Sequence, residues 1–242
     1  MIYELFQLLG DVPGARLMTY ISFRAIVAGV MGLCISIWVG NWFIQLLKRK
    51  NISETQRDEK IDPFNVAKKG VPTMGGVVII AAMLIPCLLM GKLSNVYMIL
   101  MLITTLILGT LGFADDYIKT FRGNKEGLNG WVKIAGQIIL GLIVGLTLRY
   151  SPEATMHERV TSHIENNITV FEKTPEVKST RTTIPFIKEH NFNYADMFSF
   201  LGETNKYKAG WIFFVILTIF VVAAVSNGAN LNDGMDGMCA GN

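Results

Sequence analysis

Charge is scarce in this chain and is missing from long stretches of it. Charged residues make up 17% of the 242 residues and hydrophobic residues 51%, whereas a soluble domain is about a quarter charged. The uncharged blocks approach the ~20 apolar residues that cross a bilayer, which is too long for ordinary core helices. Five blocks qualify, the fourth with one lysine near its start: 25–47, 73–91, 95–114, 131–148 and 210–226. We predict an all-α polytopic membrane protein with about five transmembrane helices.

Cysteine and histidine are scarce too. Cys34, Cys87 and Cys239 follow no spacing pattern, which argues against a disulfide framework and against a zinc site. The three histidines are irregularly spaced within 151–209, and we interpret them as surface residues. The chain begins MIYELF, with an acidic residue where a secretory signal has basic ones, so we expect no cleavable signal peptide.

The charges that are present gather in the connections between the apolar blocks. Basic residues crowd the connection after the first block and recur after the third, at Lys119, Arg122 and Lys125, whereas the turn between the second and third has only Lys92. Short loops rich in Lys and Arg stay cytoplasmic. We therefore predict an outside N-terminus, with the connections after the first, third and fifth blocks at the cytoplasmic face.

The segment 151–209 then falls on the outer side as an insert in a single integral membrane domain, 1–242. It mixes β-rich stretches, NITVF and TRTTIPFI, with charged turns. This pattern predicts a small β-hairpin.

Two adjacent carboxylates, Asp115 and Asp116, close the third block within FADDYIKTFRGNKEG. At a helix C-terminus they face the unfavourable pole of the helix dipole, so we expect a cation to hold them. Neighbouring helical side chains point about 100° apart, which lets the pair divide its work between a metal and a proton. Paired carboxylates suit Mg²⁺. The alternative is a solvated pair that marks the membrane interface.

A second acidic motif, NLNDGMDG, follows the fifth block. Asn230, Asp233 and Asp236 recur every three residues among glycines that let a backbone approach a ligand closely. An EF-hand is not completed, because the later glutamate is missing, and the motif is not a Walker A loop. The plain alternative is an Asn/Asp/Gly turn. Two crossings separate this motif from Asp115, so both should emerge at one membrane face.

A third motif, AKKGVPTMGG (67–76), begins the second block. Lys68 and Lys69 are candidate phosphate partners, and the glycine pair allows close helix packing. A basic membrane anchor followed by a proline-started helix is the alternative, since Pro72 suits a first helical turn.

Together, KKGVPTMGG, LGFADDYIK and NLNDGMDGMCAG, in this order, resemble the phospho-N-acetylmuramoyl-pentapeptide transferase family of the polyprenyl-phosphate N-acetylhexosamine-1-phosphate transferases. The match covers the chain outside 151–209, with Val71 and Asn232 where the family commonly has Thr. Family members have about ten spans and a further catalytic aspartate beyond the point that corresponds to Asn242. The resemblance thus implies the N-terminal portion of such an enzyme.

The resemblance also implies a reaction. Undecaprenyl phosphate would attack UDP-MurNAc-pentapeptide, giving lipid I and UMP at the cytoplasmic face of the bacterial inner membrane. Mg²⁺ is the implied cofactor, and the implied partners are these two substrates, the bilayer and a second copy of the chain, with no nucleic acid. The implied catalytic residues are Asp115, Asp116 and Asp233, with Asp233 also the metal ligand; the implied substrate-binding residues are Lys68, Thr73, Asn230, Gly234, Met235 and Asp236.

Within this set, Asp115 is the candidate base or orienter for the lipid phosphate, supported by Asp116. We expect the carboxylates of Asp115, Asp116 and Asp233 to lie within roughly 4–10 Å of one another around a shared Mg²⁺–pyrophosphate group. Two other functions stay open. A sister transferase would use UDP-GlcNAc, and a secondary transporter would place its carboxylates near the bilayer midplane rather than at an edge.

Overall fold

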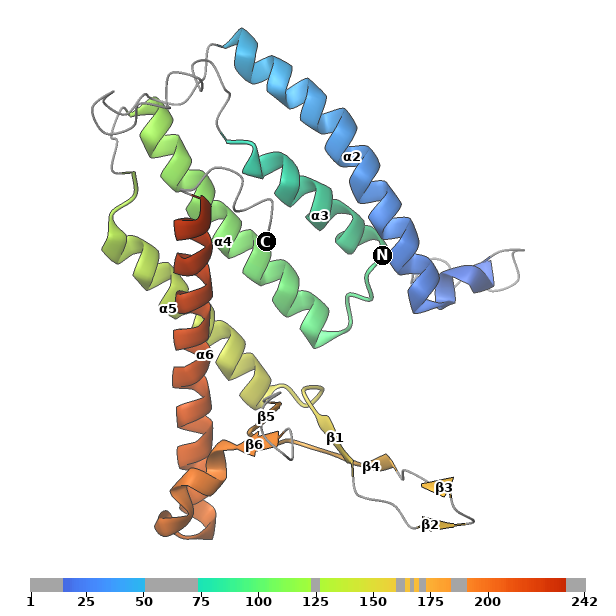
Figure 1. Cartoon of the computed structure of the whole chain (residues 1–242), viewed down its shortest axis with the longest axis vertical. Coiled ribbons are helices and arrows are strands. Elements are labelled where there is room, and N and C mark those ends of the chain that lie inside the picture. Colours follow the sequence, from blue (N-terminus) through green and yellow to red (C-terminus); the bar gives the residue numbers. More distant parts are fainter. Residues whose placement is uncertain are drawn as a thin grey trace. The chain divides into compact units, whose positions relative to one another are not determined.

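The computed structural model describes residues 15–50, 74–122, 127–159, 164–165, 168–169, 173–183 and 191–233. The chain divides into two compact units, Met1–Gly136 and Gln137–Asn242, and each is described by itself (Figure 1). Both are built mainly from long helices, as the apolar blocks predict.

The first unit consists of successive helices packed against one another. Its elements are η1 (Ala15–Thr19), α2 (Ile21–Arg49), α3 (Gly76–Met90), α4 (Val96–Phe121) and the first residues of α5 (Gly130–Tyr150). α2 and α3 are antiparallel, since Arg24 near the start of α2 donates a hydrogen bond to the Met90 carbonyl at the end of α3 (3.3 Å). α4 follows alongside α3 (Figure 1).

Small residues set the closeness of this packing. A Cβ added at Gly32 of α2 would lie 3.0 Å from the Ala82 carbonyl oxygen of α3, and one at Gly109 of α4 would lie 2.7 Å from Ile80. Glycines that let helix backbones approach each other are typical of helix–helix contacts inside membranes. α4 begins at Asn95, whose side chain accepts a hydrogen bond from the Tyr97 N–H (2.8 Å) as an N-cap.

Four described helices are long and apolar enough to cross a membrane: α2, α4, α5 and residues 205–232 of α6. This confirms a polytopic membrane protein. The second block forms a shorter apolar helix, α3, which has 15 residues and is about 22 Å long. Met74 with φ 69° precedes the helix, and Gly91 ends it in an extended conformation.

The second unit carries the insert. Three antiparallel strand pairs are described, which confirms the predicted β-hairpin character. β1 (Met156–Arg159) pairs with β4 (Lys173–Val177), β2 (Ile164–Glu165) with β3 (Ile168–Thr169), and β5 (Arg181–Thr183) with β6 (Asn191–Asn193).

A short 3-10 segment, η3 (Tyr194–Leu201), joins the insert to α6 (Glu203–Asp233). Its buried residues Tyr194 and Ala195 pack on α6, where the Tyr194 ring lies 5.5 Å from that of Phe213. The remaining part of α5 packs against α6 through glycines, since a Cβ at Gly141 would lie 2.6 Å from the Ile219 Cα atom. α6 extends beyond the predicted 210–226 block at both ends.

Candidate functional site

Asp115 lies inside α4, six residues before the helix ends at Phe121. The predicted apolar block stopped at residue 114, but the helix continues through both aspartates. Only 6% of Asp115 is exposed, which is unusual for a carboxylate without a compensating partner. The site therefore has to be explained by what surrounds this side chain.

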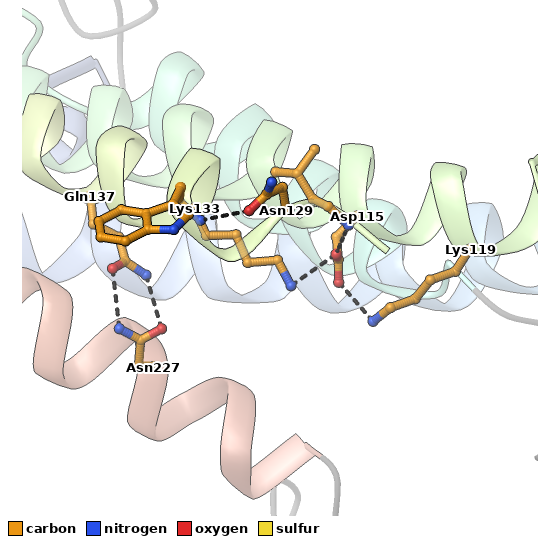
Figure 2. Close-up of polar contacts among 8 residues, drawn as sticks. Asp115, Lys119, Asn129, Lys133, Gln137 and Asn227 are labelled. Carbon is orange, nitrogen blue, oxygen red and sulfur yellow. Dashed lines mark hydrogen bonds and ion pairs between the residues drawn. The ribbon is translucent and has the colours of Figure 1, made fainter. Parts of the chain in front are cut away.

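Three donors hold the Asp115 carboxylate (Figure 2). The Lys119 Nζ atom, one helical turn on, lies 2.7 Å from Oδ2, and the Lys133 Nζ atom of α5 lies 2.9 Å from Oδ1. The Leu128 N–H donates to Oδ1 at 2.7 Å. The expectation that a cation holds this carboxylate is confirmed, and the cations are two lysines of the chain itself.

The described end of the connection from α4 to α5, residues 127–129, lies around the carboxylate. Gly127 is buried with φ 73°, and a Cβ at this position would collide with the Asp115 Oδ1 atom. Only glycine meets both conditions, because other residues rarely adopt positive φ. Asn129 then accepts a hydrogen bond from the Trp131 N–H (3.1 Å) where α5 begins, and Lys133 follows in the first turns of that helix.

This arrangement is suited to binding an anion. Two lysines against one carboxylate leave a net charge of +1, and each ammonium group has three donors. The Lys119 and Lys133 side chains are 40% and 25% exposed, so both can still reach a ligand. A phosphate is the natural partner for such donors. Asp115 itself acts here as the group that orients the two lysines.

Sequence reasoning did not assign these lysines to the site. It treated Lys119 as a loop charge and Lys133 only as a lysine near the start of the fourth apolar block. The i,i+4 spacing from Asp115 to Lys119 was a usable signal. A lone lysine in an apolar helix is another, since ionisable residues in spans tend to be functional and paired.

The described side chains around Asp115 offer few ligands for a metal ion. Asp115 is a poor metal ligand, because two ammonium groups already contact its oxygens. Asp116 is half-buried on the same turn of α4. Among the residues that the structure describes, no group of three His, Cys, Asp or Glu side chains could hold a metal ion.

Most other predicted site residues lie outside the described part of the chain. These are Lys68, Thr73, Gly234, Met235 and Asp236. Asp233 ends α6, but its side chain is not described, whereas Asn230 is exposed in the last turns of that helix. The expected convergence of Asp115, Asp116 and Asp233 stays a prediction.

The second unit contains a polar cluster that sequence reasoning missed. Gln137 of α5 is 4% exposed, and its Nε2 atom donates to the Ser226 Oγ atom (3.1 Å) and the Asn227 Oδ1 atom (3.3 Å) of α6. The Asn227 Nδ2 atom donates back to the Gln137 Oε1 atom at 3.1 Å (Figure 2). The two amides thus form a reciprocal pair just before NLND.

Comparison with known proteins places these features in a family. Residues 98–242, more than half of the chain, match the sequence profile of glycosyl transferase family 4. The chain belongs to glycosyl transferase family 4. The matched part of this family 4 chain contains both Asp115 with its lysines and the Gln137 cluster.

Three similar proteins show the name that such relatives carry. A phospho-N-acetylmuramoyl-pentapeptide-transferase of Phocaeicola vulgatus is 62% identical over 245 residues, and one of Bacteroides fragilis is also 62% identical. One of Porphyromonas gingivalis is 48% identical over 244 residues. Each alignment covers 100% of this chain and 58% of the relative, so the chain spans little more than half of the relatives' length.

Proposed function

We propose that the full-length protein containing this chain transfers phospho-N-acetylmuramoyl-pentapeptide from UDP-MurNAc-pentapeptide to undecaprenyl phosphate, giving lipid I and UMP. The observation that carries the proposal is the buried Asp115 with Lys119 and Lys133 on its two oxygens. Reactions at phosphate depend mainly on positioning and on compensating oxygen charge, and lysines held by a buried carboxylate provide both. The names of the similar proteins support this substrate over other phosphosugars.

In this proposal each residue has a distinct role. Lys119 and Lys133 bind phosphate oxygens, and Asp115 fixes where their ammonium groups lie. Asp116, next along α4, supports Asp115 in orienting the lipid phosphate. Lys68, Thr73, Asn230, Gly234, Met235 and Asp236 remain the proposed nucleotide-sugar contacts. The active site faces the cytoplasm of a bacterium, where a water-soluble nucleotide can meet a lipid phosphate at the membrane edge.

Asp233 is the residue proposed to hold Mg²⁺. A carboxylate oxygen is the ligand type that this ion prefers, and Asp115 is excluded from the role by its lysines. When bound, Mg²⁺ would compensate charge on the pyrophosphate oxygens. A second copy of the chain remains a proposed partner.

The test is a substrate choice made by the full-length protein in membranes with undecaprenyl phosphate. We expect UMP release from UDP-MurNAc-pentapeptide and little from UDP-GlcNAc. Efficient use of UDP-GlcNAc instead would favour the sister transferase. No UMP from either donor, together with ion-dependent solute uptake by vesicles, would favour a transporter.

A further inference from the structure

The reciprocal amide pair between α5 and α6 is a directional contact within the second unit. A glutamine buried in an apolar helix needs hydrogen-bond partners, because an unsatisfied amide in such surroundings is costly. Gln137 has three hydrogen bonds, all to Ser226 and Asn227. Three bonds from one side chain to adjacent residues of another helix fix the rotation of that helix as well as its distance.

Near Ser226 and Asn227 the other described α5–α6 contacts are apolar, and the Arg149 guanidinium lies over the Trp211 ring (4.8 Å) at the opposite end of the pair. Gly141 approaches Ile219, and Gly145 approaches Val215, where an added Cβ would lie 3.2 Å from either methyl group of the valine. Glycine surfaces let helices come close, but they do not specify rotation, because they offer no side chain to interlock. Buried polar residues are the known device for fixing helix register. Gln137 is a buried polar residue of this helix pair.

Ser226 and Asn227, the two partners of Gln137, lie shortly before the acidic motif on the same helix. α6 is helical through Asp233, and positions 226, 230 and 233 follow its 3.6-residue period. They therefore share one face of the helix, with position 226 held by Gln137 and positions 230 and 233 belonging to NLND. Turning α6 at Ser226 turns the two motif positions by the same angle.

We propose that Gln137 is a positioning residue for the transferase reaction: its amide pair with Asn227 and its bond to Ser226 set the direction in which the NLND motif faces. This inference rests on the proposed function for its kinetic consequence. Its geometric part, the orientation of the end of α6, does not depend on that function.

The kinetic test uses the full-length protein, purified into lipid nanodiscs. Gln137→Met keeps the length of the side chain and removes its hydrogen bonds. The double variant Gln137→Asn/Asn227→Gln exchanges the two amides and can restore the pair at the same helix separation. Thr218→Val is the matched control, since it removes only a hydrogen bond within α6, from Thr218 to the Phe214 carbonyl (2.8 Å).

We expect Gln137→Met to lower kcat for UMP release about 10- to 100-fold, as misplacement of a site by about 1 Å does. KM for the nucleotide sugar should rise as well, because Asn230, a proposed contact of that substrate, turns together with Asp233. The double variant should recover most of kcat, and Thr218→Val should keep it. A Gln137→Met protein with lower Tm but normal kcat per folded molecule would overturn the proposal, as would a well-folded double variant without recovery.

A second measurement needs no enzyme activity and also serves if Gln137→Met folds poorly. In a cysteine-free background, the rate at which a water-soluble maleimide labels Asn230→Cys reports the orientation of the motif. We expect Ser226→Ala and Gln137→Met to change this rate severalfold and the double variant to restore it. An unchanged rate in every variant would overturn the proposal, whereas absent UMP release with a changed rate would count only against the proposed function.

Discussion

At the scale of single residues, the site is built around the groups that neutralise the negative charge of one buried carboxylate. Asp115 is buried at the end of a transmembrane helix, and two lysines and one backbone N–H balance it. Leu128 and Lys133 follow Gly127, which adopts a positive φ and has no side chain that would collide with the Asp115 carboxylate. A small change at residue 127 should therefore disturb the whole cluster.

Gly127→Ala tests this dependence. We expect the free energy of unfolding to fall by about 1–2 kcal/mol, the usual cost of a positive φ for an L residue, with a further loss from contact with Asp115. Gly112→Ala in α4 is the matched control, because an added Cβ there meets nothing within 4 Å. Thermal unfolding of both proteins in nanodiscs measures the difference, and equal Tm values would show that Gly127 is not needed.

At the scale of elements, the apolar blocks predicted the helices well but not their ends. α4 continues to Phe121 because lysines neutralise Asp115, whereas a hydropathy boundary stops at the first charge. The pairing of Lys133 with Asp115, eighteen residues apart in sequence, depends on how α4 and α5 pack, which spacing alone does not reveal. The partners of Gln137 were hidden for the same reason. By contrast, the sequence alone predicted that the carboxylate pair needs a cation, because carboxylates at a helix C-terminus face the unfavourable pole of the helix dipole.

η3 is the element whose surroundings the sequence did not suggest. Its Ala195 packs on Gly210, about five residues or 7.5 Å inside the apolar part of α6, so we expect η3 to lie at the level of the membrane interface. Phe200 and Met197 are 78% and 49% exposed. Aromatic side chains are enriched at that level of a membrane protein.

We therefore expect Phe200 to contact lipid. A nitroxide label on Phe200→Cys in nanodiscs should collide with oxygen more than with a water-soluble nickel complex. The control is Asp196→Cys on the same segment, an exposed acidic position that should show the opposite preference. Equal preference for the nickel complex at both positions would mean that η3 lies in water.

At the scale of the whole molecule, four described helices can cross a membrane, and the orientation follows from loop charge alone. The prediction is an outer N-terminus and an outer insert at 151–209. Two serines test it, Ser53 in the basic connection after α2 and Ser162 in the insert; both lie outside the described residues.

Single-cysteine variants at these two positions, labelled from outside intact cells with an impermeant maleimide, should react at Ser162→Cys and not at Ser53→Cys. Permeabilised cells, in which both should react, provide the control. Labelling from outside at residue 53 but not at residue 162 would reverse the orientation and move the acidic motifs to the outer face.

The central claim is that Asp115 organises a phosphate-binding site for sugar-phosphate transfer, together with Asp233. Its most direct test is kcat for UMP release by the full-length protein carrying Asp115→Asn or Asp233→Asn, with His163→Ala as the control. We predict that each aspartate variant loses orders of magnitude in kcat at unchanged expression, because Asp115 positions the phosphate-binding lysines and Asp233 is the proposed Mg²⁺ ligand, while His163→Ala keeps wild-type turnover. Near wild-type kcat for Asp115→Asn would contradict the account.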